Sequence, residues 1–381
     1  MKILHLMIVE KFTKPVSLFY NENFGDRGHE ICYILKKDEK SLPLTDLIIP
    51  NITFRISDRL FDDYKRIKRL YDSYDFVVVH SIWVLPIISH LLYFMSKSML
   101  NKTIWIEWGS DLYDTGKTLN PLKNIKRLLL NRIKNNCFAM VGIFQPDCVF
   151  FKTIFPKSKS RVLYAPYCGN NISPDLLKPY NSICHLEETI TKGEPVYILI
   201  GHNGMETLNH IEVLRYLKRF AANNIKIVLS LGYGGSKKYA NKVQKMAQEL
   251  FPNKVVCLRK MIPYSEYMGL IEKIDIAIFD TKRQCGLGNI YSLIYHNVKI
   301  FMPHDGVMYN FFYSNGVPVQ KLETLKTINF ETFVRPVSPH NTTLFDEYIS
   351  KLSSFEWQIN CWNNVYSFLE EEMQKRGDVS F

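Results

Sequence analysis

The stretch that decides the fold is Val196-Tyr-Ile-Leu-Ile-Gly-His-Asn-Gly-Met-Glu-Thr-Leu-Asn-His-Ile-Glu-Val-Leu-Arg-Tyr-Leu217. Its first five residues are apolar or aromatic, which predicts a buried strand, and apolar residues return at helical spacing after a turn at 201–204. Strand, small-residue turn and helix form the half-unit with which α/β proteins hold anions, because backbone N–H groups and the positive end of the helix dipole face the ligand. The stretch holds neither a GxGxxG nor a Walker motif, so by itself it favours an ordinary turn without a ligand.

Length and composition narrow the class of protein. A chain of 381 residues is long for one hydrophobic core and predicts two domains, and 46% hydrophobic with 22% charged residues is typical of a folded globular protein. The formal charge of +11 indicates an anionic partner: nucleic acid, an anionic membrane surface or a nucleotide-linked substrate. The eight cysteines show no CxxC pair or metal-ligand spacing, so we expect reduced thiols in a cytosolic protein and no cofactor.

Strand-like and helix-like segments alternate along both halves of the chain, which predicts two doubly wound, mostly parallel sheets. Between the halves the periodicity fades in a polar stretch punctuated by proline and glycine. The expected organisation is a Rossmann-like domain at 1–172, a linker at 173–195, a second Rossmann-like domain at 196–342 and C-terminal helices at 343–381. Two such domains predict a cleft between them, where ligands usually bind.

One segment has to be weighed as a membrane span. Residues 76–95 hold no Asp, Glu, Lys or Arg and are long enough to cross a bilayer. The segment also contains His80, Pro86 and His90, and it divides into a strand at 76–79 and a helix beginning near Pro86. A buried strand and helix is the better interpretation. The N-terminus shows no cleavage site, so we expect a protein that is soluble or bound to a membrane from one side.

Polar residues follow a predicted strand at Trp105-Ile-Glu-Trp-Gly-Ser-Asp-Leu-Tyr-Asp114. This places Asp111 beyond the carboxyl end of a strand, where α/β sites are built, among aromatic residues that would desolvate it. Desolvation raises the pKa of a carboxyl group and suits it to general-base catalysis. A capping role for Asp111 fits equally well. His80, at the end of the neighbouring strand, is a second candidate base, although a lone histidine there is more often structural.

A basic amphipathic helix is predicted from about Pro121. No acidic residue occurs between Asp114 and Asp147, and apolar residues stand at helical spacing among the basic ones. Such a helix either lies on an anionic lipid surface or packs on its own sheet with its charges outward. The missing acids favour a membrane or phosphate contact, and the aromatic residues are not interleaved as nucleic-acid stacking platforms. The surface residues predicted to contact membrane or acceptor are Lys123, Lys126, Arg127 and Arg132.

Two more turns of the anion-binding kind follow strands in the second half. The first holds Gly232 and Tyr233, whose ring could stack on a nucleobase or simply pack. In the second, Arg283 offers a planar fork for phosphate, and Gly286 and Gly288 clear a helix N-terminus for an anion. All three turns face the same edge of a parallel sheet, which favours an anion site. There is no DxD motif, so no metal is predicted to bridge a diphosphate.

At these residues the chain resembles the enterobacterial TDP-N-acetylfucosamine:lipid II N-acetylfucosaminyltransferases, the 4-alpha-L-fucosyltransferases of glycosyltransferase family 56. Trp-Gly-Ser-Asp-Leu-Tyr at 108–113 is similar to the family's Trp-Gly-(Ala/Ser)-Asp-Leu-Tyr element. His202 and Asn203 stand where the family has Asn-Ser, and Glu107 has no acidic counterpart there. Other similar positions, in chain order, are His80, Tyr164, Pro166, Gly201, Gly204, His210, Ile211, Gly232, Tyr233, Tyr267, Arg283, Gln284, Gly286 and Gly288.

The resemblance implies a metal-independent glycosyltransferase of α/β, GT-B type, with two Rossmann-like domains facing across a cleft and C-terminal helices. The N-terminal domain would bind a polyprenyl-diphosphate-linked saccharide and the C-terminal domain a TDP-linked 4-acetamido-4,6-dideoxyhexose. It implies a peripheral protein on the cytoplasmic face of the bacterial inner membrane, in common-antigen or O-antigen synthesis, with no nucleic-acid partner. The implied catalytic groups are Asp111 and His80. The implied donor-binding residues are Gly201, Asn203, Gly232, Tyr233, Arg283, Gln284, Gly286 and Gly288.

Two alternatives stay open from the sequence. The first is a GT-B transferase that uses a UDP- or GDP-linked sugar. The second is a non-catalytic basic module that binds anionic lipid or nucleic acid.

Overall fold

The computed structural model describes residues 1–9, 12–36, 49–88, 91–113, 120–167, 185–337 and 342–378. The chain divides into two compact units, one formed by Met1–Asn170 with Phe355–Phe381 and the other by Asn171–Ser354. We call them unit 1 and unit 2. Most of the predicted linker, residues 173–184, lies outside the described residues, and its remainder begins with helix α9, His185–Thr191.

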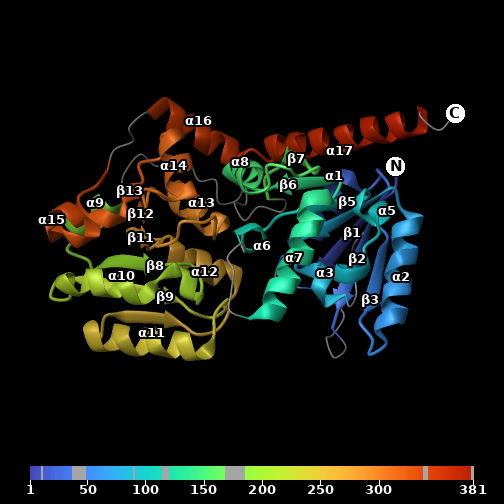
Figure 1. Cartoon of the computed structure of the whole chain (residues 1–381). Helices are drawn as coiled ribbons and strands as arrows, with labels where there is room; N and C mark the ends of the chain where they lie inside the picture. Colours follow the sequence, from blue (N-terminus) through green and yellow to red (C-terminus); the bar gives the residue numbers. More distant parts are fainter. Residues whose placement is uncertain are drawn as a thin grey trace. The chain divides into compact units, whose positions relative to one another are not determined.

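Unit 1 is built on a parallel sheet of seven strands in the order β3-β2-β1-β4-β5-β6-β7 (Figure 1). This is the strand order of a Rossmann fold, extended by one strand. Most of the strands are buried along nearly their whole length because helices cover both faces. The strands are β1 Ile3–Ile8, β2 His29–Leu35, β3 Asn51–Arg55, β4 Phe76–His80, β5 Thr103–Ile106, β6 Ala139–Gly142 and β7 Arg161–Tyr164.

Two hydrophobic clusters cover the two faces of this sheet. Successive residues of β1 point to opposite sides, so Leu4 and Leu6 join one cluster and Ile3 and Met7 join the other. The helices of unit 1 are α1 Thr13–Phe24, α2 Leu60–Ser73, α3 Val84–Ile87, α4 Leu91–Phe94, α5 Lys97–Leu100, α6 Ser110–Tyr113, α7 Pro121–Asn136, α8 Gln145–Ile154 and α17 Phe355–Asp378.

The uncharged segment 76–95 begins with β4 as predicted, and its strand is fully buried. The single helix expected near Pro86 is replaced by the short helices α3 and α4, and α5 follows them. Pro86 lies inside α3, and its backbone nitrogen carries no hydrogen to donate. The helix ends one residue later. Among the described residues, no helix is both long and apolar enough to cross a bilayer.

Unit 2 repeats the pattern with a six-stranded parallel sheet in the order β10-β9-β8-β11-β12-β13, again the Rossmann order. The strands are β8 Val196–Ile200, β9 Ile225–Ser230, β10 Val255–Leu258, β11 Ile276–Ile278, β12 Lys299–Met302 and β13 Gln320–Lys321. The helices after α9 are α10 His210–Leu217, α11 Lys237–Leu250, α12 Tyr264–Ile271, α13 Leu287–Tyr295, α14 Val307–Ser314, α15 Phe330–Val334 and α16 Thr342–Ser353.

The two closing helices belong to different units. Helix α16 is part of unit 2, whereas α17 returns to unit 1 and packs beside β7 (Figure 1). Trp362 anchors α17 there, because its indole is buried and its Nε1 donates to the carbonyl oxygen of Pro166 at 2.9 Å. The C-terminal helix therefore completes the core of the N-terminal unit.

Candidate functional site

In unit 2 the predicted turns lie at the topological switch point of the sheet, where β8 and β11 pair. Gly201 leaves β8 with a φ of 63°, and its N–H donates to the carbonyl oxygen of Ile278 at 2.9 Å. A Cβ on Gly201 would lie 2.9 Å from Nε2 of His210, so only glycine fits between the strand and α10.

The turns after β8 and β9 contact each other through their backbones. The N–H of Gly204 donates to the carbonyl oxygen of Tyr233 at 2.8 Å. A Cβ on Gly235 would lie 1.7 Å from the carbonyl oxygen of Gly204, and one on Gly232 would lie 2.6 Å from the backbone of Lys260. These glycines are needed for close backbone approach, which fixes the shape of the turns.

His202 and Asn203 are buried under these turns. The side-chain amide nitrogen of Asn203 lies 2.9 Å from Nε2 of His202, and its Oδ1 accepts from the N–H of Met205 at 3.0 Å. The His202 ring lies between Tyr233 and Phe279, with centroids 6.5 and 6.3 Å away. His202 and Asn203, which differ from the family's Asn-Ser, are thus packed into the turn and hydrogen-bonded within it.

Arg283 reaches from the turn after β11 to the turn after β8. Its Nη2 donates to the hydroxyl of Thr207 at 3.3 Å and contacts the sulfur of Met205 at 3.7 Å. Its Nε is buried and has no hydrogen-bond partner within the part of the chain that the structure describes. Such a guanidinium retains donor capacity for an anion. The sequence could not reveal Thr207 and Met205 as its partners.

Helix α13 begins at this point with Gly286 as its N-cap, at a φ of 58° and without a side-chain cap. Its first backbone N–H groups are therefore open to an anion. Gln284 is buried beside the turn, and Gly288 lies in the first turn of the helix. The structure brings together the predicted donor residues that follow β8, β9 and β11 at one edge of the unit 2 sheet.

In unit 1, Asp111 is fully buried and both carboxylate oxygens accept hydrogen bonds. Oδ2 accepts from the hydroxyl of Ser81 at 3.0 Å, the N–H of Ile82 at 2.8 Å and the indole of Trp105 at 2.9 Å. Oδ1 accepts from the N–H of Trp108 at 2.8 Å. This carboxylate joins the ends of β4 and β5. Its catalytic role stays a prediction, and the geometry favours a positioning role.

His80 ends β4 and is the first of three buried histidines in a row. Its Nε2 lies 3.0 Å from Nδ1 of His5, and Nε2 of His5 lies 2.8 Å from Nδ1 of His29. Burial lowers the pKa of His80 to about 3 and that of His29 to about 4, so the rings are neutral at pH 7. The catalytic role of His80 also stays a prediction.

Two further buried carboxyl groups, those of Glu107 and Asp147, lie beside Asp111. Glu107 accepts from the N–H groups of Gly109 at 2.6 Å and Ile143 at 3.1 Å. Burial, reinforced by Asp147 and Asp111, raises the pKa of Glu107 well above its usual range, and burial raises the pKa of Asp147 to about 6. Through these two hydrogen bonds Glu107 ties together the turns after β5 and β6.

Helix α7 forms at Pro121 as predicted, with Asn120 as its N-cap. Lys123, Lys126 and Arg132 are exposed and Arg127 is partly buried, whereas Lys134 is buried and donates to the backbone oxygen of Asp111. The expected apolar face is only partly covered. Leu122 (75% exposed) and Ile125 (48%) of this face are exposed. Leu128, which the helical spacing did not assign to the face, is also exposed (68%).

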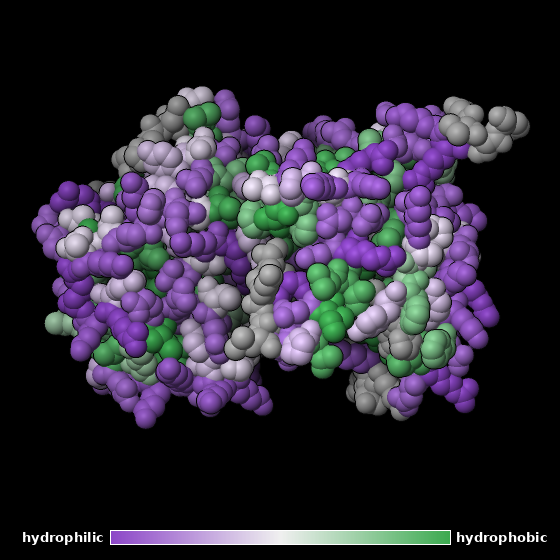
Figure 2. All heavy atoms as spheres, viewed as in Figure 1, coloured by the Kyte–Doolittle hydropathy of each residue, from purple (hydrophilic) through white to green (hydrophobic). Residues whose placement is uncertain are grey.

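Figure 2 shows apolar atoms gathered over α7 and the short helices beside it. Helix α4, which packs against α7, adds the exposed side chains of Tyr93 and Phe94. We call Tyr93, Phe94, Leu122, Ile125 and Leu128 the apolar ridge. Exposed apolar residues among lysines are typical of a surface that contacts lipid.

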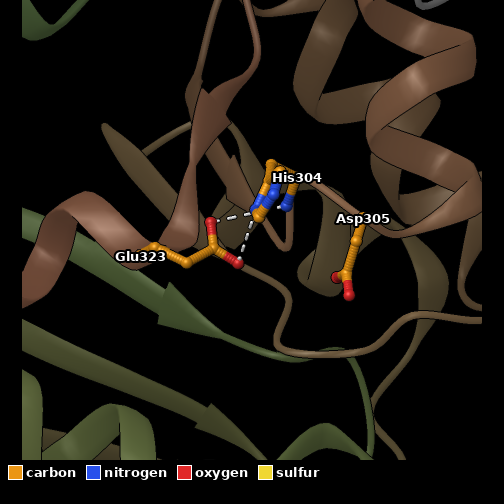
Figure 3. A group of neighbouring side chains, drawn as sticks. All are labelled: His304, Asp305 and Glu323. Atoms are coloured by element: carbon orange, nitrogen blue, oxygen red, sulfur yellow. Dashed lines mark hydrogen bonds and ion pairs between the residues drawn. The ribbon is translucent and has the colours of Figure 1, made fainter.

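One exposed group of unit 2 has side chains of metal-ligand type, namely His304, Asp305 and Glu323 (Figure 3). Nδ1 of His304 lies 3.2 Å from a carboxylate oxygen of Glu323, and Asp305 beside them pairs with Lys282 at 2.5 Å. The imidazole and the carboxylates are thus engaged with partners of their own. Ion pairs on the surface explain this group without a metal.

Comparisons with known proteins agree with this architecture. A family model described as 4-alpha-L-fucosyltransferase, glycosyl transferase group 56, matches residues 76–332. Sucrose-phosphate synthase from Thermosynechococcus elongatus has a TM-score of 0.66 at 10% identity, covering 98% of this chain and 100% of that one. Alpha,alpha-trehalose 6-phosphate synthase from Burkholderia multivorans has a TM-score of 0.65 at 10% identity, with 100% and 98% covered.

A third similar structure is HepE from Anabaena in complex with UDP and glucose, with a TM-score of 0.64 at 12% identity and 97% and 100% of the two chains covered. At these identities the likeness shows the fold, which is GT-B as predicted.

Proposed function

Because the chain belongs to the 4-alpha-L-fucosyltransferase family, glycosyl transferase group 56, we propose that it transfers a 4-acetamido-4,6-dideoxyhexose of N-acetylfucosamine type from a TDP donor. The protein is a glycosyltransferase, which removes the alternative of a non-catalytic binding module. The proposed acceptor is a polyprenyl-diphosphate-linked saccharide at the cytoplasmic face of the bacterial inner membrane. The product would serve common-antigen or O-antigen synthesis.

The observation that carries the donor proposal is the open N-terminus of α13 beside Arg283. Transfer breaks the bond between the anomeric carbon and the diphosphate, so negative charge develops on the leaving TDP. Helix N–H groups and a guanidinium with spare donors stabilise that charge. In this proposal Gly201, Asn203, Gly232 and Tyr233 surround the nucleotide, while Gln284, Gly286 and Gly288 line the diphosphate. This proposal requires no metal ion at His304, Asp305 and Glu323.

Unit 1 is proposed to present the acceptor hydroxyl, whose oxygen forms the new bond to the anomeric carbon as its proton leaves. Asp111 fixes the turns after β4 and β5 through its four hydrogen bonds. His80 ends β4 in the same region and is held by His5. We propose that both side chains position the acceptor edge of the sheet.

The membrane part of the proposal is supported by the apolar ridge and by the exposed Lys123 and Lys126 on the same helix. Apolar side chains that enter the interfacial region and lysines that meet anionic headgroups reinforce each other. A lipid-linked acceptor is accessible to an enzyme held in this way.

The proposal is tested by titrating the full-length protein with TDP, UDP and GDP by calorimetry. We expect TDP to bind about tenfold or more tightly than UDP, because a methyl group and a hydroxyl distinguish them. Arg283→Ala should weaken TDP binding about tenfold or more. Arg215→Ala, which removes an exposed arginine of α10, is the matched control and should bind TDP normally. Equal affinity for the three nucleotides, or unchanged binding by Arg283→Ala, would refute the donor assignment.

A further inference from the structure

We propose that a basic cavity in unit 1, at the opposite edge of the sheet from His80 and Asp111, binds the glycerophosphate group of an anionic phospholipid. The cavity has a volume of about 570 Å³. Five cationic side chains line it. They are Lys97 of α5, Arg132 of α7, Lys159 just before β7, Arg161 of β7 and Arg376 of α17.

The cavity lies at the edge where the strands begin. Arg161 is the first residue of β7, and Phe138 immediately precedes β6. His80, by contrast, is the last residue of β4, and Asp111 follows β5. Because the strands are parallel, their beginnings and ends lie at opposite edges of the sheet, so this cavity is separate from the proposed acceptor edge.

Within the described residues, acidic side chains neutralise only part of the charge in the cavity. Glu372 pairs with Arg161 at 2.7 Å but is shared with Lys375 at 2.9 Å. Lys97, Arg132 and Lys159 form no ion pair within the described part of the chain. A cavity with this excess of cations favours an anion that carries several acceptor oxygens.

Two of the guanidinium groups are held against one aromatic ring. Those of Arg161 and Arg376 lie 4.7 and 4.6 Å from the centre of the Phe138 ring. Burial and the neighbouring Arg161 lower the pKa of Arg376. Glu372 attracts both groups, and Arg376 also donates to the backbone oxygen of Asn101 at 3.1 Å. A phosphate that enters the cavity matches the fork geometry of a guanidinium.

The position of the cavity on α7 points to a lipid as the source of the phosphate. Arg132 and Asn136 line the cavity, and Arg132 follows Leu128 of the apolar ridge by one helical turn, on the same side of the helix. A helix lying on the membrane through its ridge would bring a headgroup to the cavity. This choice of source rests on the proposed membrane surface, whereas the anion site itself does not.

The test uses the full-length protein with phosphatidylcholine vesicles, with and without phosphatidylglycerol, and with free glycerol 1-phosphate. The double variant Lys97→Gln/Lys159→Gln should weaken the phosphatidylglycerol-dependent binding of vesicles about 30-fold, because each lysine contributes about 1 kcal/mol. Asn101→Trp, which fills the cavity at constant charge, should also abolish the binding of glycerol 1-phosphate. Lys242→Gln/Lys245→Gln on α11 is the charge-matched control and should retain both. Far-ultraviolet circular dichroism and a cooperative urea unfolding transition verify the folding of every variant.

Vesicle binding that depends on phosphatidylglycerol and is lost in both cavity variants supports the proposal. Unchanged binding by Asn101→Trp would overturn it, because the attraction would then be diffuse. Binding of free glycerol 1-phosphate in the cavity without any effect of phosphatidylglycerol would overturn the lipid source and indicate a soluble phosphate ester. None of these readouts uses a sugar donor, so failure of the glycosyl-transfer proposal is detected separately.

Discussion

Gly286 lies against the imidazole of His202, and a Cβ at this position would come within 2.6 Å of His202 Nδ1. The residue also has a φ of 58°, in the left-handed region that favours glycine. The N-terminus of α13 can therefore approach the turn after β8 only if residue 286 has no side chain. The Arg283 turn and the Gly201 turn therefore pack directly against each other.

Gly286→Ala should lower TDP affinity about tenfold or more, because the new methyl group must displace His202 or the start of α13. The matched control is Gly269→Ala in α12, where a Cβ meets nothing within 4 Å. That change should stabilise the protein by about 0.5–1 kcal/mol, since alanine is the better helix former. Calorimetry and thermal unfolding give the two values, and equal TDP affinity in both variants would contradict the packing described.

Asp111→Asn should lower the free energy of unfolding of unit 1 by about 3 kcal/mol, because an amide cannot accept all four of the hydrogen bonds that the carboxylate accepts. All five tryptophans of the chain lie in unit 1, so urea unfolding followed by tryptophan fluorescence reports on this unit. If Asp111 positions the acceptor, the pH dependence of kcat keeps its shape in the folded variant. A lost acidic limb in that profile would instead assign Asp111 as the base.

Unit 1 should lose stability as the pH falls from about 6.5 to about 4. Histidines of the unfolded chain have pKa values near 6.5, whereas burial lowers those of His80 and His29 to about 3 and about 4, so the unfolded state binds more protons in this range. Each histidine contributes a slope of about 1.4 kcal/mol per pH unit. Burial also lowers the pKa of His5 well below its usual range, so three histidines act in this direction. Glu107 and Asp147, with raised pKa values, contribute with the opposite sign, and the three histidines outweigh these two carboxyl groups.

The change in slope on His29→Gln isolates the histidine contribution. This variant should flatten the pH dependence of the free energy of unfolding by about 1.4 kcal/mol per pH unit. An unchanged slope would show that His29 titrates normally in the folded protein. The same fluorescence-detected urea titrations provide the measurement.

Leu128→Glu should weaken binding to phosphatidylcholine–phosphatidylglycerol vesicles about tenfold or more, because it places a charge in the apolar ridge. Val149→Glu is the control, since Val149 is 66% exposed on α8 of the same unit. Both variants should bind TDP normally. Co-sedimentation checks the prediction, and equal vesicle binding by the two variants would place the membrane contact elsewhere.

Chelation of divalent metals by EDTA should leave glycosyl transfer unchanged. Arg283 and the N-terminus of α13 are proposed to neutralise the diphosphate without a metal. Glu323→Gln, which alters the exposed His304 group, should also leave the rate unchanged. Loss of activity in EDTA that is restored by Mg²⁺ or Mn²⁺ would contradict the metal-independent mechanism.

The donor turns could be predicted from sequence because each depends on a local pattern. Arg283 and Gly286 follow a strand and open a helix, and the order of parallel strands brings such turns to one edge. The partners of these residues could not be predicted. Thr207 meets Arg283 across 76 positions of sequence, through the pairing of β8 with β11.

The contacts at the proposed acceptor edge of the unit 1 sheet were harder to predict. His5 and His80 are 75 positions apart and meet because β1 and β4 are neighbours in the sheet. The amphipathic pattern of α7 did not reveal that Lys134 is buried or that Leu122 is exposed, because periodicity gives the faces of a helix and not what covers them. Asp111 was recognised as notable, yet its four donors come from strand β5 and from the turns after β4 and β5, which only the fold brings together.

The central claim is that this chain moves a sugar from TDP to a lipid-linked saccharide. The most direct measurement follows labelled N-acetylfucosamine from its TDP, UDP and GDP derivatives into polyprenyl-diphosphate-linked acceptor in vesicles. We predict label in the lipid fraction with one TDP released per sugar, and transfer from the UDP and GDP donors about tenfold slower or more. Equal or faster transfer from a UDP or GDP donor, or TDP release without labelled lipid, would contradict the claim.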